Sequence, residues 1–508
     1  MPQHHVSHPR GSDVAPKSVF IEGRFGRMFR NLPSFEPPDP ALDELASTMQ
    51  EASTPTQPAD SWTPSREENS DGEIPAGFTY LGQFIDHDLT FDPVSSLQRQ
   101  NDPDALHDFR TPRFDLDSLY GGGPNNDPFM YNPDIDEGRT TLLVGKVADT
   151  DPPEDDLPRN VVPPDGNGEP RGRALIGDPR NDENIIVSQL HLQFMKFHNK
   201  VVETVRGAQP GLSPDALFEE AQRITRWHYQ WIVVNDFLRR LVGDEVVESI
   251  LKHPKLDGED DARKGGNYLV SPDGAVTRFP KLDLRFYRWH NQPFMPVEFS
   301  VAAYRFGHSM IRPTYKINDV VPELPIFSSN ENPGRLEAFH GFRPLPPRWT
   351  IQWEFFFETG DGSKMQVVRK IDTNLALGIF HLPDKNVVMR NLAARNLKRG
   401  RALGLPSGQR IAHAMGIDPL TDEQLGITQT NAVFEGNAPL WFYVLKEADV
   451  CAGGKKLGPV GGRIVTEVLL GLLKGDSSSF INVHPNWTPT LGDGSDFKMA
   501  DLIKFVAS

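Results

Sequence analysis

Gly82-Gln83-Phe84-Ile85-Asp86-His87-Asp88 is the most informative stretch of the chain, because it places an amide, two acids and an imidazole in an otherwise apolar segment. On an α-helix Gln83, Asp86 and His87 stand three and four residues apart and share one face. Asp88 is turned by about 100° onto a neighbouring face. One helix would then carry a base with polar neighbours on one side and a hard oxygen ligand on the other. The simpler alternative is a solvated turn of helix, since a histidine beside two acids is a weak signal alone.

The composition describes a globular chain with many loops. Its 508 residues are enough for one large domain or a few average ones. Hydrophobic residues make up 38% of the chain, and 45 prolines and 43 glycines interrupt it. The formal net charge of −16 argues against a nucleic-acid surface, which needs clustered Lys and Arg. We therefore expect no nucleic-acid partner.

Cys451 is the single cysteine, so no internal disulfide can form, which fits a reducing compartment or a bacterial source. The N-terminus has no apolar run of signal-peptide length, and the longest apolar stretch, near residues 464–473, contains Thr466, Glu467 and Gly471. We expect no membrane span, a monomer, and either a cytoplasmic location or secretion by a non-classical route.

The hydrophobic pattern predicts a mainly α fold with little β structure. The clearest helix has apolar residues at three- and four-residue steps over 186–201, with Asp178 and Asp182 available to cap its start. Further helices are predicted over 213–241, 300–311, 385–400 and 463–474. Weak alternation indicates strands at 350–357 and 364–369.

Residues 1–70 are rich in Pro, Ser and acidic residues, which predicts an extended, loop-rich N-terminal arm that packs locally at best. A second loop-like stretch spans 149–171. The globular domain is then expected over 71–508.

Arg180 and Glu183 lie three residues apart at the start of the long helix and so point the same way. The commoner use of such residues is a helix start with a stabilising acid in its first turn. His191 and His198, seven residues apart on the apolar face of the helix, are interpreted as core histidines with satisfied nitrogens.

The segment Thr111-Pro112-Arg113-Phe114-Asp115-Leu116-Asp117 places oxygen groups at alternate positions. Ca²⁺ takes about six to eight hard oxygens at roughly 2.3–2.6 Å, so carboxylates, a hydroxyl and a backbone carbonyl suit it. The alternative is an Asp-rich turn. The metal interpretation gains weight only if a further carboxylate such as Asp88 reaches this loop.

Residues 300–311 form an apolar segment with one histidine, His308, next to the small Gly307, which lets something approach closely. Arg305, one turn earlier, would sit beside whatever His308 touches. A lone histidine on an apolar helix is more often structural than a ligand. Asn396 has no chemistry of its own.

Taken in chain order, these segments resemble the peroxidase-cyclooxygenase superfamily, the animal-type haem peroxidases, known also in bacteria. The resemblance runs from about residue 75 to near the C-terminus. It rests on the motifs Gly-Gln-Phe-Ile-Asp-His-Asp, Asp-Leu-Asp-Ser-Leu-Tyr-Gly, Gly-Asp-Pro-Arg-Asn-Asp-Glu, Tyr-Arg-Phe-Gly-His and Arg-Asn-Leu-Lys-Arg-Gly-Arg. It implies a helical fold around a buried haem, with the haem peroxidase catalytic domain over 71–508.

The resemblance also implies a role for each candidate residue. The distal catalytic residues would be His87, Gln83 and Arg180. The haem b would be held by His308 as iron ligand, with Asn396 bonded to its other ring nitrogen, Arg305 on a propionate, and ester links through Asp86 and Glu183. The Ca²⁺ ligands would be Asp88, Thr111, Arg113 (through its carbonyl), Asp115 and Asp117.

The implied activity is reduction of H₂O₂ to water through a ferryl intermediate, with oxidation of small electron donors such as phenols and, as further candidates, bromide, iodide or thiocyanate. Two departures matter. Asn184 stands where some members carry a Met that makes a third haem link, so at most two links are expected. The chain reads Arg401-Ala402-Leu403-Gly404 where many members read Arg-Asp-His-Gly, which changes local contacts but removes no proposed ligand.

Two alternatives stay open. A haem-dependent fatty-acid dioxygenase or cyclooxygenase-like enzyme uses a Tyr one turn before the proximal His, but here that position is Arg305, and Tyr304 is one residue off. A binding protein that keeps the fold without turnover could lose His87, Arg180 or His308, yet this chain keeps all of them. Both comparisons favour a peroxidase.

Overall fold

The protein is mainly helical, as the sequence predicts: of the residues that the structure describes, 47% lie in helices and 9% in strands. The computed structural model describes residues 23–50, 70–90, 107–108, 110–133, 139–160, 162–163, 172–252, 268–270, 276–278, 281–289, 292–327, 336–382, 390–492 and 496–508. In these residues no helix is both long enough and apolar enough to cross a membrane.

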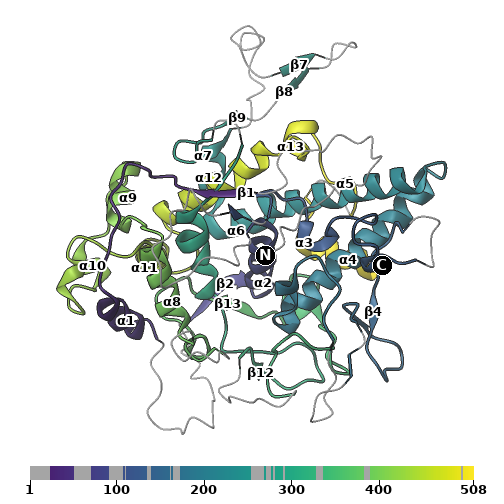
Figure 1. Cartoon of the computed structure of the whole chain (residues 1–508), viewed down its shortest axis with the longest axis horizontal. Helices are drawn as coiled ribbons and strands as arrows, with labels where there is room; N and C mark the ends of the chain where they lie inside the picture. Colours follow the sequence, from purple (N-terminus) through teal and green to yellow (C-terminus); the bar gives the residue numbers. More distant parts are fainter. Residues whose placement is uncertain are drawn as a thin grey trace.

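Two long helices form the scaffold for the rest of the molecule. Helix α4 (Ile185–Ala208) packs beside α5 (Pro214–Ile232), and the shorter α2 (Gly77–Leu89) packs on α4 (Figure 1). The apolar stripe predicted over 186–201 lies on α4, and its side chains are buried. The predicted caps are wrong: Asn184 caps α4 by accepting a hydrogen bond from the Val187 amide, at 2.9 Å. Asp178 instead caps the short 3₁₀ helix η3 (Pro179–Asp182) that precedes it.

The pattern over 213–241 is confirmed as one helical run. Ser213 caps α5, which continues through a π-helical stretch, η4 (Val233–Leu238), into α6 (Arg239–Val242). The prediction over 463–474 is confirmed by α12 (Pro459–Gly475). Helix α8 (Leu392–Ala402) follows its cap Asn391, and residues 385–389 of the helix predicted over 385–400 lie outside the described residues.

The segment that carries His308 is helical but not an α-helix. It begins as a π-helix, η6 (Glu298–Ala302), and tightens into a 3₁₀ helix, η7 (Ala303–His308). The Ser300 carbonyl accepts a hydrogen bond from Arg305 Nε at 3.0 Å, and the Ser300 hydroxyl donates to the Pro296 carbonyl at 3.2 Å. These side-chain bonds compete with the regular ladder, which accounts for the departure from a uniform helix.

The remaining helices are short or lie near the C-terminus. They are α1 (Asp39–Thr48), α3 (Asp117–Tyr120), α7 (Asp244–Ile250), α9 (Gly408–Met415), α10 (Asp422–Leu425), α11 (Leu440–Ala452), α13 (Phe480–Val483) and α14 (Met499–Ala507), with 3₁₀ turns η2 (Pro128–Met130), η8 (Trp353–Phe355), η9 (Leu377–Phe380) and η11 (Ala432–Phe434). Helices α11 and α12 pack together and close the core behind η7.

The strands are short and form one three-stranded sheet and several two-stranded pairs among the described residues. A three-stranded sheet has the order β10 (Met295–Pro296), β1 (Gly23–Gly26), β3 (His107–Asp108). The two-stranded pairs are β2 (Asp71–Pro75) with β13 (Val367–Arg369), β4 (Gly145–Lys146) with β5 (Asp155–Asp156), β6 (Leu251–Lys252) with β9 (Lys281–Leu282), β7 (Tyr268–Val270) with β8 (Val276–Arg278), and β11 (Thr314–Tyr315) with β12 (Leu324–Pro325). The β7–β8 pair projects from the body at the top of Figure 1.

The two strand predictions have different outcomes. Residues 364–369 include β13, which pairs antiparallel with β2. Residues 350–357 form no strand; they contain the 3₁₀ turn η8, where Trp353 packs edge-on against Phe356. The aromatic side chains of this stretch face the core. Their burial, and not hydrogen bonding to a neighbouring strand, determines the backbone conformation of residues 350–357.

The N-terminal segment enters the core. Ala41, Leu42, Leu45 and Ala46 of α1 are buried, and α1 packs against α8. Further upstream the buried Glu298 accepts hydrogen bonds from the amides of Met28 and Phe29, both at 3.0 Å. The expectation that the arm packs locally at best is therefore wrong for residues 23–50, and the domain boundary at residue 70 stays a prediction.

Candidate active site

His87 lies on the inner side of α2 and is 6% exposed, while Asp88 beside it is fully buried. This burial excludes a solvated turn of helix. The Nδ1 atom of His87 lies 2.8 Å from Oδ1 of Asn181, and its Nε2 has no hydrogen-bond partner among the described residues. Burial, assisted by the charge of Arg180, lowers the pKa of His87 to about 4. His87 is therefore a neutral imidazole with a free nitrogen.

Gln83, one turn before His87, reaches the segment that begins α4. Its amide nitrogen donates to the Glu183 carboxylate, and its amide oxygen accepts from Asn184 Nδ2 at 3.2 Å. The Glu183 side chain is exposed to solvent and yet surrounded by protein, so it lines a hollow. That burial raises the pKa of the Glu183 carboxyl to about 7. Asp86 is partly buried and accepts from the Thr90 hydroxyl at 3.3 Å.

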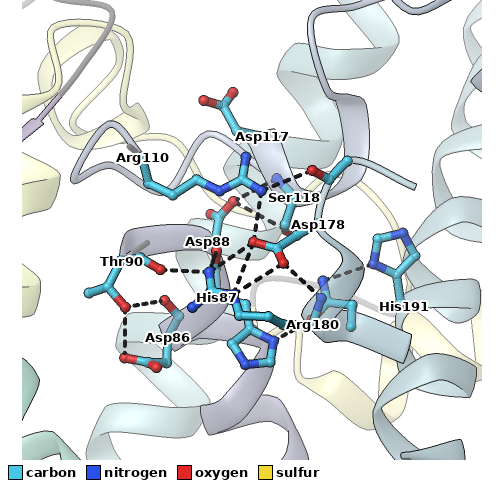
Figure 2. Close-up of polar contacts among 12 residues, drawn as sticks. Asp86, His87, Asp88, Thr90, Arg110, Asp117, Ser118, Asp178, Arg180 and His191 are labelled. Carbon is cyan, nitrogen blue, oxygen red and sulfur yellow. Dashed lines mark hydrogen bonds and ion pairs between the residues drawn. The ribbon is translucent and has the colours of Figure 1, made fainter. Parts of the chain in front are cut away.

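Arg180 is held at the C-terminal end of α2. Its guanidinium donates to the backbone carbonyls of His87 at 3.0 Å and Thr90 at 2.6 Å, and forms an ion pair with Asp178 at 2.8 Å (Figure 2). Arg110 binds the same carboxylate oxygen, Oδ2 of Asp178, at 2.7 Å. Burial alone would raise the pKa of the Asp178 carboxyl. Arg180 and Arg110 outweigh that effect and hold the pKa well below its usual range. Arg180 thus places a fixed positive charge next to His87.

His308 ends η7 on another side of the core. Its Nδ1 lies 2.8 Å from the amide nitrogen of Asn396 on α8, and its Nε2 has no hydrogen-bond partner in the part of the chain that the structure describes. Burial, with Arg305 and Arg395, lowers the pKa of His308 to about 3. A side chain added at Gly307 would meet nothing within 4 Å, so open space adjoins His308.

The elements carrying His87 and His308 face each other. The Tyr304 hydroxyl of η7 donates to the Gly82 carbonyl of α2 at 3.2 Å. The charges of Asp86 and Arg180 act on the pKa of Arg305, which burial lowers to about 10. No carboxylate among the described residues forms an ion pair with Arg305. A buried guanidinium without an acid partner is costly, and an anionic group in the hollow would satisfy it.

These features fit a haem. His87 and His308 each keep a free Nε2 atom, open space adjoins His308 at Gly307, and a cofactor carboxylate could pair with Arg305. The charge of Asp86 acts on Glu183, so these two acids lie near each other. The roles of these residues toward a haem stay predictions.

Asp88 reaches the 111–117 loop, as the metal interpretation requires. Its carboxylate accepts from the Leu116 amide at 3.2 Å and from the Ser118 amide at 3.4 Å. Within the loop, the Thr111 hydroxyl donates to Asp115 at 2.8 Å and to Asp117 at 3.4 Å. Arg113 follows Thr111 in the same loop, and its amide donates to the Thr111 carbonyl at 2.7 Å.

Arg110 acts on Asp88 and Arg226 on Asp115, but these cations compensate the acid cluster only in part. Burial and the charge of Asp117 raise the pKa of Asp88 to about 7 and also raise that of Asp115. The buried Oδ1 atom of Asp115 has no hydrogen-bond partner among the described residues. No three His, Cys, Asp or Glu side chains of the described residues stand in a ready-made metal-binding arrangement. The oxygen donors of the loop are of the kind that Ca²⁺ takes, but their arrangement does not show a site, so the ligand set stays a prediction.

Sequence reasoning missed the residues behind His87. Asn181 bridges His87 and His191, whose Nδ1 lies 3.0 Å from the Asn181 amide nitrogen. The prediction of satisfied nitrogens is confirmed for His198, which contacts the Tyr120 hydroxyl and the Thr140 carbonyl, each at 3.0 Å. It is wrong for His191, because its buried Nε2 has no partner among the described residues. The available signal was the position of Asn181 next to Arg180.

A mainly helical fold that buries His87 and His308 on separate elements, each with a free Nε2, is compatible with a helical haem protein. The family profile named animal haem peroxidase matches residues 106–454. The chain belongs to the animal haem peroxidase family.

Curated relatives agree with this family. The chain is 26% identical over 252 residues to chorion peroxidase of Drosophila melanogaster, covering 48% of this chain and 26% of that protein. It is 30% identical over 241 residues to a peroxidase-like protein of Margaritifera margaritifera, covering 45% and 26%. It is 25% identical over 248 residues to human thyroid peroxidase, covering 47% and 22%. The chain spans only about a quarter of the length of these relatives.

Solved structures show the same fold. Peroxidase A from Dictyostelium discoideum superimposes with a TM-score of 0.60 at 16% identity, over 97% of this chain and 94% of that one. A fatty acid alpha-dioxygenase from Arabidopsis thaliana gives 0.57 at 15% identity, over 93% and 76%. At these identities the likeness shows the fold alone.

Proposed function

We propose that this protein is a haem peroxidase that reduces H₂O₂ and oxidises small electron donors. The observation that carries the proposal is the pairing of His87, a neutral imidazole with a free Nε2, with the fixed charge of Arg180. A base and a cation side by side are what heterolytic cleavage of a peroxide requires. Family membership supports the same reading.

On the proximal side, His308 would bind the haem iron through Nε2, and Arg305 would pair with a propionate. When bound, haem supplies the redox chemistry of the iron centre. With Nε2 on the metal, Nδ1 of His308 would carry the proton, so the Asn396 amide, whose nitrogen lies 2.8 Å from Nδ1 in this structure, would turn by 180° to present its oxygen. A neutral amide pulls less on that proton than a carboxylate, so His308 would be less anionic as an iron ligand, which would favour a strongly oxidising cofactor.

On the distal side, His87 Nε2 would take the proton from the inner oxygen of the peroxide and return it to the outer oxygen. Such a shuttle typically contributes ~10²–10⁴-fold in rate. Arg180 would stabilise the negative charge that develops on the leaving oxygen. Gln83 would orient a distal water or small anion.

Asp86 and Glu183 are proposed as the sites of ester links to haem. Gln83 holds the Glu183 carboxyl in place. The raised pKa of Glu183 means that burial disfavours the charged carboxylate there. An ester removes a buried charge and fixes the cofactor.

The proposed Ca²⁺ ligands are Asp88, Thr111, Arg113, Asp115 and Asp117. The proposed electron donors are phenols, bromide, iodide and thiocyanate. We also propose that the protein is a monomer and is either cytoplasmic or secreted by a non-classical route.

The deciding experiment is an absorbance spectrum of the purified protein followed by titration with H₂O₂ and a phenolic donor. We expect a Soret band that changes on peroxide addition and returns with the donor. His87→Leu should keep haem but slow the peroxide reaction by roughly 10²–10⁴-fold, whereas His308→Leu should lose haem. His198→Gln, a buried histidine outside the hollow, is the control for general damage.

A chain that binds no haem, or in which His87→Leu loses haem while His308→Leu keeps it, would contradict the proposal. Oxygen uptake with a polyunsaturated fatty acid separates the dioxygenase alternative. No uptake is expected, because the Tyr304 hydroxyl is hydrogen-bonded to the Gly82 carbonyl and its ring stacks on Phe299 at 4.6 Å.

A further inference from the structure

Three buried side chains form a continuous hydrogen-bonded row behind the distal base. His87 Nδ1 lies 2.8 Å from Asn181 Oδ1, and Asn181 Nδ2 lies 3.0 Å from His191 Nδ1 (Figure 2 labels both histidines). Asn181 and His191 are fully buried. The row joins α2, η3 and α4, so it links three separate elements.

The chemistry of the amide gives this row a direction. An asparagine side chain offers an acceptor at one end and donors at the other. Since Asn181 Oδ1 faces His87, Nδ1 of His87 must carry the proton and donate it. Since Asn181 Nδ2 faces His191, Nδ1 of His191 must accept. The lone pair of His87 is then on Nε2, and the proton of His191 is on its own Nε2.

We propose that Asn181 and His191 are positioning residues that hold His87 in the tautomer with a basic Nε2. The inference rests on the proposed function, because it explains how the base of that reaction is prepared. If the amide turned by 180°, its N–H would face His87 Nδ1 and the proton would move to Nε2. A protonated Nε2 cannot take a proton from peroxide.

His191 acts through the amide of Asn181, because its Nδ1 gives the amide N–H a place to bond. Its ring is held by an edge-on contact with Phe84 of α2, with centroids 5.8 Å apart. The neighbouring His198 on α4 is equally buried, but both of its nitrogens bond to Tyr120 and Thr140 and not to the row. His198 is therefore a matched control.

The test compares Asn181→Leu, Asn181→Asp, His191→Leu and His191→Gln with the wild type and with His198→Gln. For each, haem content, the second-order rate constant with H₂O₂, and the rate of reduction by a phenolic donor are measured. Asn181→Leu should slow the peroxide step by roughly 10–100-fold, part of what the base supplies, and leave the donor step unchanged. Asn181→Asp should restore the peroxide step, because a carboxylate accepts from Nδ1.

The double variant Asn181→Asp/His191→Leu gives the sharpest result. His191→Leu alone should slow the peroxide step, and His191→Gln should recover it, because the Gln carbonyl can accept from Asn181. In the Asn181→Asp background the His191→Leu change should have no effect, since a carboxylate needs no partner to orient it. Equal slowing in both backgrounds, or equal slowing by His198→Gln, would overturn the inference.

Histidine ¹⁵N spectra separate this inference from the proposed function. They are recorded on the purified chain, in the diamagnetic ferrous carbon-monoxide form when haem is present. The wild type should show His87 protonated at Nδ1, and Asn181→Leu should not. If the wild type fails to react with peroxide but shows this tautomer, the proposed function fails and the inference about Asn181 stands. If His87 is protonated at Nε2 in the wild type, the inference is wrong whatever the activity.

Discussion

Burial decides the protonation of single residues in this site. His87 and His308 are surrounded by protein and lie near arginines, and both stay neutral because a second positive charge there would be desolvated. Glu183 shows the same effect with the opposite sign, since its protonated form is the neutral one. The groups proposed as base and iron ligand are therefore uncharged near neutral pH, and a substantial fraction of Glu183 is protonated there.

The peroxide reaction should accordingly be insensitive to pH over a wide range. The pKa of His87 is lowered to about 4, so the base is neutral and active above that pH. We expect a rate constant for H₂O₂ that is flat between about pH 5 and 8 and falls only near pH 4, well below the ordinary histidine pKa of ~6.5. Stopped-flow measurements, with circular dichroism to confirm folding, test this.

Linkage gives the same group a known effect on stability. The pKa of His87 is lower in the folded protein than in the unfolded chain. The contribution of neutral His87 to folding stability is therefore fully present above pH ~6.5 and is lost as the pH falls through about 4. A rate constant that already falls at pH 6.5 in folded protein would show that His87 titrates normally and would contradict the burial argument.

The sequence could identify His87, Arg180 and His308 because each stands in a motif with specific neighbours. It could not identify Asn181, since its role depends on His191, ten residues further along the chain and on another element. Nor could it show that Arg180 is shared between Asp178 and the carbonyl end of α2. Such partners are set by tertiary packing.

At the scale of elements, α2 couples two sites because His87 and Asp88 are adjacent on it. Asp88 bonds to the backbone at Leu116 and Ser118, so the acid loop and the distal base share one rigid support. The unpartnered Asp115 Oδ1 and the raised pKa values of Asp88 and Asp115 describe a loop that gains from a cation.

Removal of Ca²⁺ should therefore disturb the distal side as well as the loop. Ligand binding at a hundredfold excess over Kd stabilises a fold by about 2.7 kcal/mol. We expect a chelated sample to show a lower thermal midpoint, an altered Soret band and a slower peroxide reaction, all restored by added Ca²⁺. Metal analysis must confirm the removal. Unchanged spectrum, midpoint and rate in a verified Ca²⁺-free sample would exclude the coupling.

Elements with a strong periodic pattern were predictable, and elements shaped by side-chain contacts were not. The stripe of α4 is long enough to define a helix by itself. The η6–η7 segment has a similar apolar pattern, but the Arg305 bond to the Ser300 carbonyl changes its register. Residues 350–357 alternate weakly and yet fold as a 3₁₀ turn, because their aromatic side chains pack into the core.

At the scale of the whole molecule, the N-terminal segment supports the elements that carry His308 and Asn396. Helix α1 packs on α8, which carries Asn396. Arg27 donates to the carbonyls of Leu403 at 2.7 Å and Gly404 at 2.8 Å, just beyond α8. Glu298, at the start of the segment that ends at His308, accepts from Met28 and Phe29. Composition alone predicted a loose arm here, because the short apolar stripe of α1 lies among many polar and proline residues.

Leu45→Ala tests whether this segment belongs to the folded core. Leu45 is fully buried against the core, so its truncation should cost about 2–5 kcal/mol of unfolding free energy and weaken haem retention through α8. Ser47→Ala, an exposed change on the same helix, should shift stability by less than ~0.5 kcal/mol. Urea unfolding followed by fluorescence and by the Soret band measures both. If residues 1–70 were a dispensable arm, the two variants would unfold alike, and the packing of α1 on α8 would have no energetic importance.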